Sequence, residues 1–254
     1  MTRIGIFDSG LGGLTVLKEL SKTNKSQYFY FGDSLRVPYG GRSEEELRKF
    51  SADIVDFLEK FDIDYYVIAC NTLSVTVTDF LREKYKKKFI PITDLALKAC
   101  DKYQGEFLVL GTETTIKSHF YKNNLEKNPE NIVYEVAASK LVDFIEADKK
   151  DDKKLNEYID SYIKIANQKK IENILLACTH YPIIREKIER RLGYKANIID
   201  PAIFLSESLE SASDNLDINI FMSKKTPATE HLIPKLIDFP YKLNYTKEHL
   251  WFMQ

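Results

Sequence analysis

Two cysteines of this chain stand in matching sequence contexts. Cys70 follows the apolar run YYVIA and precedes Asn-Thr, and Cys178 follows NILLA and precedes Thr-His. Each run is typical of a buried strand, so each thiol is expected where a strand ends and a helix begins. The partial positive charge of a helix N-terminus favours thiolate over thiol. Two such thiols on opposite sides of one carbon atom could remove a proton from one face and deliver one to the other, which is two-base racemisation or epimerisation.

Hydroxyl and amide donors gather at the same strand ends. The hydroxyls are those of Ser9, Thr72, Thr112, Thr115 and Thr179. The backbone amides of Asn71–Thr72 and of Thr179–His180 would lie at helix N-termini, where amides bind carboxylates. We therefore expect the two thiols to share a site for a small ligand that carries a carboxylate.

Three further side chains are candidates to assist the thiols. Asp8 ends the first apolar run and could orient or deprotonate Cys70, although an acid there can also simply cap the next helix. His180 lies two residues after Cys178 and could serve that thiol, or be a hydrogen-bonded core histidine. Glu146 could support His180, or be a solvated acid on a helix.

Competing motifs fit this sequence poorly. GLGGLT after the first strand is similar to a dinucleotide fingerprint, with Asp33 as a possible ribose ligand, but Thr15 stands where a third glycine is needed. Leu11 occupies the lysine position of a phosphate-binding loop. A thiol hydrolase would need only one cysteine and would leave the repeat unexplained. The segment RVPYGGRS (36–43) is a turn in which Tyr39 could bind a carboxylate, or an ordinary Pro/Gly turn.

Composition excludes several classes of protein. The 37 Lys+Arg and 38 Asp+Glu of the 254 residues give a net charge of −1, so no basic field for nucleic acid is expected. No apolar run is long enough to cross a membrane, and the N-terminus does not read as a signal peptide. Three cysteines favour a reducing compartment over a disulfide framework. The histidines and cysteines lack zinc-site spacing, so no metal is expected. Cys100, in a helix-like stretch, is interpreted as a buried apolar residue.

Apolar runs alternate with amphipathic stretches, which predicts an α/β fold of parallel sheets. The predicted strands are 4–7, 28–31, 65–69, 89–92, 107–111, 173–177 and 196–199, and the predicted helices include 13–22, 43–61 and 155–170. The order of a strand with a polar end and then a strand with Cys occurs twice, which predicts two similar α/β domains. We place the first in residues 1–95 plus 209–254 and the second in 96–208. Because ligands bind beyond the carboxyl ends of parallel strands, the site is expected in the cleft between them.

The segments IGIFDSGLGGLTVL, YFGDSLRVPYG, IACNTLSV, LGTETTIKSHFY and LACTHYP together resemble the cofactor-independent glutamate racemases of the aspartate/glutamate racemase superfamily. The resemblance covers nearly the whole chain. It implies two pseudosymmetric α/β domains around glutamate, with Cys70 as the base for the D-enantiomer and Cys178 for the L-enantiomer. It also implies a cytoplasmic homodimer without cofactor that supplies D-glutamate for peptidoglycan, and an acid at Glu146 paired with the motif histidine. The substrate contacts that it implies are Asp8, Ser9, Tyr39, Gly40, Asn71, Thr72, Thr179 and His180.

The chain departs from that family at a few positions. Leu73 and Val75 stand where the family usually has alanines, and Asp94 stands where it often has Glu or Pro. Leu73 is expected to pack under the site, with a place in the pocket as the alternative. No N-terminal extension precedes the first strand, so we expect no muropeptide activator site. Two other functions stay open: that of an aspartate racemase or related decarboxylase, and that of a non-catalytic amino-acid-binding protein.

Overall fold

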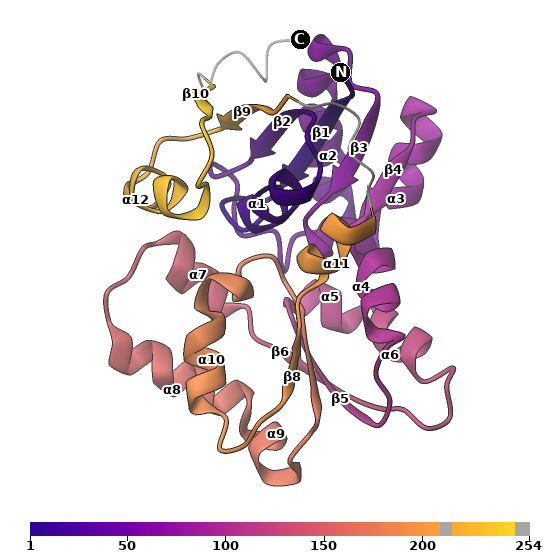
Figure 1. Cartoon of the computed structure of the whole chain (residues 1–254), viewed down its shortest axis with the longest axis vertical. Helices are drawn as coiled ribbons and strands as arrows, with labels where there is room; N and C mark the ends of the chain where they lie inside the picture. Colours follow the sequence, from indigo (N-terminus) through magenta and orange to yellow (C-terminus); the bar gives the residue numbers. More distant parts are fainter. Residues whose placement is uncertain (209–214, 247–254) are drawn as a thin grey trace.

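The computed structural model describes residues 1–208 and 215–246, which form two sheets of parallel strands (Figure 1). The first sheet has the strand order β10-β9-β2-β1-β3-β4 and the second β6-β5-β7-β8. The first sheet contains β1 (Arg3–Asp8), β2 (Gln27–Gly32), β3 (Tyr65–Ile68), β4 (Phe89–Pro91), β9 (Asp217–Met222) and β10 (Lys242–Tyr245). The second contains β5 (Glu106–Gly111), β6 (Ile132–Ala137), β7 (Asn173–Ala177) and β8 (Asn197–Ile199). The predicted α/β class is confirmed.

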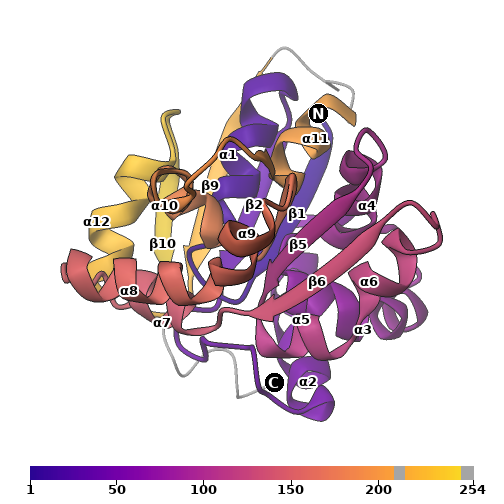
Figure 2. The same ribbon diagram turned by 90° about the horizontal axis from the view of Figure 1, so that it is seen from below.

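Helices cover both faces of each sheet. They are α1 (Leu14–Thr23), α2 (Glu44–Leu58), α3 (Asn71–Tyr85), α4 (Ile92–Cys100), α5 (Glu113–Lys117), α6 (Phe120–Leu125), α7 (Lys140–Glu146), α8 (Asp152–Tyr162), α9 (Lys164–Lys169), α10 (Arg185–Arg191), α11 (Pro201–Ser208) and α12 (Pro227–Leu236). Two short 3₁₀ helices span Glu59–Phe61 and Tyr181–Ile184. Figure 2 shows α7, α8 and α10 on one side of β5 and β6, with α4 and α6 on the other.

The register of the strands brings their polar ends to common edges. In the first sheet Phe7 pairs with Ile68 and Asp8 with Gly32, so the ends of β1, β2 and β3 lie side by side. In the second sheet Gly111 pairs with both Ala137 and Ala177, so the residues after β5, β6 and β7 are neighbours. Residues far apart in the sequence therefore meet wherever one of these strands ends.

Local sequence explains where several elements begin. The capping box predicted for α2 is present: Ser43 accepts from the amide of Glu46, whose carboxylate accepts from the amide of Ser43. All seven predicted strands are confirmed to within about one residue. The predicted helix 155–170 is divided at Ile163 into α8 and α9. The strands β6, β9 and β10 were not predicted.

The two predicted domain boundaries, after residues 95 and 208, lie at α4 and at the end of α11. The expected boundary after residue 95 falls inside α4, and α11 packs against α1 and α4 rather than against the helices of the second sheet. Residues 215–246 return to the first sheet, where β9 pairs with β2 (Figure 1). The predicted return point, within residues 209–214, lies outside the described residues, as does the end of the chain from residue 247. Within the described part, no helix is both long and apolar enough to cross a membrane.

Leu73 belongs to the hydrophobic core. It is fully buried among apolar residues of α2, α3 and β3 and does not line the pocket described below. Val75 lines a separate surface groove with Arg42 and Thr76. The expectation that Leu73 packs under the site is confirmed. Cys100, on α4, is likewise buried in a core cluster.

Candidate active site

A pocket between the two sheets holds both cysteines of the sequence repeat. Its lining consists of Ser9, Pro38, Tyr39, Gly40, Cys70, Asn71, Thr72, Thr112, Ser139, Val142, Asp143, Cys178, Thr179 and His180. Cys70 comes from the end of β3 and the start of α3, and Cys178 from the end of β7. The two thiols thus reach one pocket from different sheets, as the repeat predicts.

Cys70 is a buried thiol in a setting that disfavours negative charge. Its sulfur donates a long hydrogen bond of 3.9 Å to the hydroxyl of Ser9. Burial raises the pKa of Cys70 to about 12, and the nearby Asp8 carboxylate adds to the shift. At neutral pH Cys70 therefore carries its proton in the ligand-free protein.

Cys178 has a very different neighbour. Its sulfur lies 3.7 Å from Nδ1 of His180, whose Nε2 lies 2.6 Å from Oε1 of Glu146. Burial lowers the pKa of His180, but its hydrogen bonds with Cys178 and Glu146 outweigh burial and hold the pKa well above its usual value. The imidazole is therefore positively charged near neutral pH, and this cation lies directly beside the Cys178 sulfur.

Glu146 and Asp8 tie the loop after β1 to the second sheet. Oε1 of Glu146 accepts a 2.7 Å hydrogen bond from the amide of Leu11 as well as its contact with His180. The carboxylate of Asp8 accepts 3.0 Å hydrogen bonds from the amide of Gly10 and the hydroxyl of Thr179. Burial raises the pKa of Asp8, partly offset by the charge on the neighbouring His180. Both acids lie behind the residues that line the pocket, not on its surface.

The glycines after Asp8 allow this close approach. A Cβ on Gly12 would lie 2.4 Å from Oγ1 of Thr179 and 2.5 Å from Nδ1 of His180. Any larger residue at this position would push the second sheet's thiol loop away. The glycine run that resembles a dinucleotide fingerprint therefore serves contact between the two halves.

Three predicted threonines form a chain of hydroxyls beside the pocket. Thr72 Oγ1 lies 2.8 Å from Thr112 Oγ1, which lies 3.0 Å from Thr115 Oγ1. Thr112 also caps α5 by accepting from the amide of Thr115. Thr72 and Thr112 line the pocket, whereas the fully buried Thr115 stands behind Thr112.

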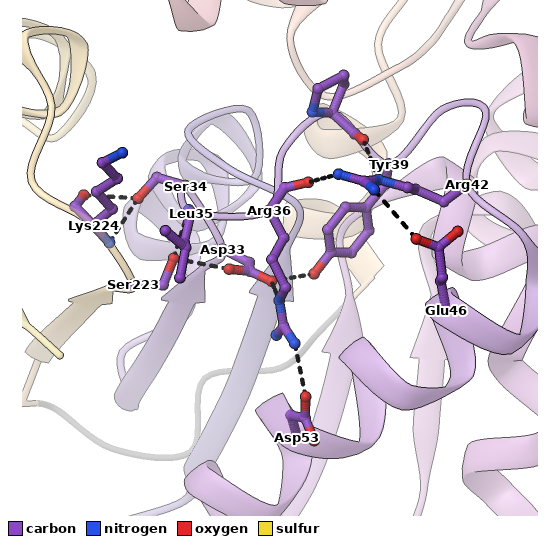
Figure 3. A network of polar contacts seen from close by, with 11 residues as sticks. Asp33, Ser34, Leu35, Arg36, Tyr39, Arg42, Glu46, Asp53, Ser223 and Lys224 are labelled. Atoms are coloured by element: carbon purple, nitrogen blue, oxygen red, sulfur yellow. Dashed lines mark hydrogen bonds and ion pairs between the residues drawn. The ribbon is translucent and has the colours of Figure 1, made fainter. Parts of the chain in front are cut away.

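The segment with Tyr39 and Gly40 is held in place by Asp33 (Figure 3). The buried carboxylate of Asp33 accepts a 2.5 Å hydrogen bond from the Tyr39 hydroxyl and one of 2.8 Å from Ser223. Arg36 pairs with Asp33 and, at 2.7 Å, with Asp53. The Tyr39 hydroxyl thus donates its proton to Asp33, while Tyr39 itself lines the pocket, and its expected contact with a ligand stays a prediction. Gly40 approaches the second half so closely that a Cβ would lie 2.9 Å from Cβ of Thr112.

Sequence reasoning missed part of the pocket wall. Pro38, Ser139, Val142 and Asp143 line the pocket but were not singled out. Ser139, Val142 and Asp143 follow β6, a strand that was not predicted although IVYEVA (132–137) alternates apolar and polar residues over part of its length. Within the described residues, no three or more His, Cys, Asp or Glu side chains gather as a metal site.

Comparison with known proteins agrees with this geometry. The family model described as Asp/Glu/Hydantoin racemase matches residues 7–208. Glutamate racemase 3 of Caldanaerobacter subterraneus subsp. tengcongensis is 39% identical over 208 residues, which cover 78% of this chain and 74% of that protein. The crystal structure of glutamate racemase isoform RacE1 from Bacillus anthracis superimposes with a TM-score of 0.88 at 27% identity, over 97% of both chains. That of the Francisella tularensis glutamate racemase in complex with D-glutamate gives 0.85 at 28% identity, over 98% of both. By its sequence and its fold, this chain belongs to the Asp/Glu/hydantoin racemase family.

Proposed function

We propose that this protein interconverts L- and D-glutamate by proton transfer between the substrate and two thiols. One observation carries the proposal: Cys70 and Cys178 enter a single pocket from opposite sheets. Binding alone would not need two thiols, whereas inversion at a carbon atom needs a base on one face and an acid on the other. The substrate class follows from the relatives, which are named glutamate racemases, one of them solved with D-glutamate.

The reaction conserves one thiol and one thiolate. A Cys178 thiolate takes the α-proton of L-glutamate and becomes a thiol, and the electron pair of the C–H bond stays on the α-carbon. The Cys70 thiol then gives its proton to the opposite face, which yields D-glutamate and a Cys70 thiolate. The reverse reaction runs through the same steps with the two residues exchanged. The high pKa of Cys70 and the cation at His180 suit this starting state.

The pocket offers fixed dipoles to the charge that develops on the substrate. Asn71 and Thr72 are the first residues of α3, so their amides lie at the positive end of that helix. A carboxylate held there becomes more negative as the carbanion forms, and preorganised donors then stabilise it more strongly than water does. Removal of one such donor typically costs about 10²–10³-fold in rate.

The other predicted site residues form two groups, according to whether they line the pocket or lie behind its lining. We assign substrate contact to residues that line the pocket, and support to those behind it. The contact group is Ser9, Tyr39, Gly40, Asn71, Thr72, Thr112, Thr179 and His180, and the support group is Asp8, Thr115 and Glu146. In this assignment Asp8 orients Thr179 and Glu146 orients His180.

We also propose that the protein works in the cytoplasm as a homodimer, without metal or cofactor, and supplies D-glutamate for peptidoglycan. Three buried free cysteines support a reducing compartment. The family resemblance supports the dimer. The membership of the strands supports a first domain of 1–95 plus 209–254 and a second of 96–208, with α4 and α11 between them.

The deciding experiment follows the circular dichroism of L-glutamate and of D-glutamate, each incubated with the pure chain and no added cofactor. Both signals are expected to decay to zero. The same reaction in D₂O tests the two-base mechanism, because early product must carry deuterium at the α-carbon while recovered substrate does not. Parallel incubations with L- and D-aspartate decide the substrate class. Flat traces with glutamate would refute the proposal, and a faster decay with aspartate would reassign the substrate.

A further inference from the structure

Tyr121 connects the second half of the molecule to a pocket residue of the first. It lies on α6 and is fully buried among α4, β5 and β7. Its hydroxyl donates a 2.5 Å hydrogen bond to Oδ1 of Asn71, the first residue of α3. Asn71 is itself buried and lines the pocket that holds both Cys70 and Cys178. Sequence analysis did not single out Tyr121.

This hydrogen bond decides which end of the Asn71 carboxamide faces the ligand. A carboxamide can present either its carbonyl oxygen, an acceptor, or its NH₂ group, a donor of two hydrogen bonds. Burial raises the pKa of Tyr121 far above its usual value, so the hydroxyl keeps its proton, and the hydrogen bond runs from this hydroxyl to Oδ1 of Asn71. The carbonyl oxygen is therefore committed to Tyr121. Among the described residues, the NH₂ group of Asn71 has no acceptor, so it is left for a ligand.

We propose that Tyr121 is a positioning residue that fixes the Asn71 carboxamide with its NH₂ group toward the anionic substrate. The proposal rests on the glutamate racemase function proposed above. The fixed orientation matters because glutamate offers carboxylate oxygens, which attract the NH₂ group and repel a carbonyl oxygen. It matters equally for both enantiomers, which share the pocket.

Tyr121→Phe tests the proposal because it removes only the hydroxyl. To bind substrate, Asn71 must then leave its carbonyl oxygen buried without a donor. We expect KM to rise at least about five-fold, the factor that corresponds to about 1 kcal/mol for such an oxygen, with kcat within about two-fold of wild type. Because enantiomers have equal free energies, kcat/KM must remain equal in the two directions, so KM should rise for both.

Tyr194→Phe is the matched control. The Tyr194 hydroxyl donates a 2.6 Å hydrogen bond to the backbone carbonyl of Ile171, away from the pocket. Its loss should lower the melting temperature without a change in KM. A Tyr121→Phe variant that behaves like Tyr194→Phe, less stable but with unchanged KM, would reduce Tyr121 to a structural role and overturn the proposal.

A double-mutant cycle gives the second readout. Asn71→Ala removes the NH₂ donor, so adding Tyr121→Phe to it should change KM by less than about two-fold. Effects that multiply would contradict the proposal. If Tyr121→Phe does not fold, Asn71→Asp replaces it: the carboxylate still accepts from Tyr121 but has lost the donor, and KM should rise by more than about ten-fold. Wild-type KM for Asn71→Asp would overturn the proposal. Failure of wild-type protein and Tyr194→Phe to racemise glutamate would instead refute the proposed function.

Discussion

Glu146→Gln isolates the charge that keeps His180 protonated beside Cys178. Oε1 of Glu146 lies 2.6 Å from Nε2 of His180 and accepts from the amide of Leu11 at 2.7 Å. A glutamine oxygen can accept from the amide of Leu11 as the glutamate does, so the loop after β1 should stay in place. What is lost is the negative charge that pairs with a buried imidazolium. The variant therefore tests electrostatics more than packing.

The size of the effect follows from the type of bond. A hydrogen bond between charged partners contributes about 1.5–3 kcal/mol, and each 1.4 kcal/mol is ten-fold in an equilibrium or rate constant. We expect kcat/KM to fall by about 10–150-fold, equally for L- and D-glutamate, since the equilibrium constant between enantiomers is one. A difference between the two thiols can therefore appear in kcat and in KM separately, but not in their ratio.

The pKa of His180 determines in which direction the pH profile of Glu146→Gln should shift. Hydrogen bonds with Cys178 and Glu146 hold the pKa of His180 above its usual value against the effect of burial, so removing the Glu146 charge must lower it. The alkaline limb of the kcat/KM profile should move to lower pH. The same raised pKa stabilises the folded state fully below the unfolded value of 6.5 and loses that effect as pH rises through the folded pKa. The melting-temperature difference between wild type and variant should therefore shrink with rising pH.

Initial rates by circular dichroism in both directions, across a range of pH, make the measurement. Glu189→Gln is the control, because Glu189 pairs with Arg185 on the exposed face of α10 and should leave kinetics unchanged. A Glu146→Gln enzyme within two-fold of wild type, with an unshifted alkaline limb, would refute the reasoning about His180.

Three other outcomes are expected. Cys70→Ser and Cys178→Ser should each abolish racemisation, measured by circular dichroism, and full activity in either variant would contradict a two-thiol mechanism. Cys100→Ser should turn over normally, because Cys100 is buried in a core cluster away from the pocket. Leu73→Ala should cost about 3 kcal/mol and lower the melting temperature by about 6–12 °C with unchanged KM, and Val75→Ala, half-buried, should cost less; a changed KM would show that Leu73 acts on the pocket. Exhaustive dialysis against a chelator should leave the rate unchanged, and recovery by a divalent metal after a loss would overturn that expectation.

Strand ends were the part of the fold that sequence could predict well. The runs before Cys70 and Cys178 are apolar except for Asn173, as expected of parallel strands buried on both faces, and both are strands in the structure. β9 is harder, because its residues alternate between buried and half-buried, and it joins the sheet from the far end of the chain. β6 is an edge strand in which only Val133 is buried, so its composition carries little signal.

The pocket residues that follow strands could be predicted from the sequence, whereas the residues that hold them in place could not. Ser9, Thr112 and Thr179 follow strands in sequence, and the parallel register alone brings such positions together. Asp33 could be noticed as the residue after β2, but its partner Ser223 is adjacent only because β9 pairs with β2 through Gly32 and Met222. The pairing of Tyr121 with Asn71 likewise depends on how α6 of one half meets α3 of the other. Contacts of this kind follow from tertiary packing, which no local pattern encodes.

The sequence repeat makes the two thiols look equivalent, and their surroundings make them different. Cys70 faces the Asp8 carboxylate and stays a thiol, while Cys178 faces the cation of His180. In the proposed mechanism L-glutamate reacts with the form that has a thiolate at Cys178, and D-glutamate requires the form with a thiolate at Cys70, which the high pKa of Cys70 makes rare. This asymmetry does not favour one enantiomer overall, because the thiolate that is less populated is also the stronger base. The imbalance in population and the imbalance in reactivity cancel in kcat/KM, as the equal free energies of the two enantiomers demand.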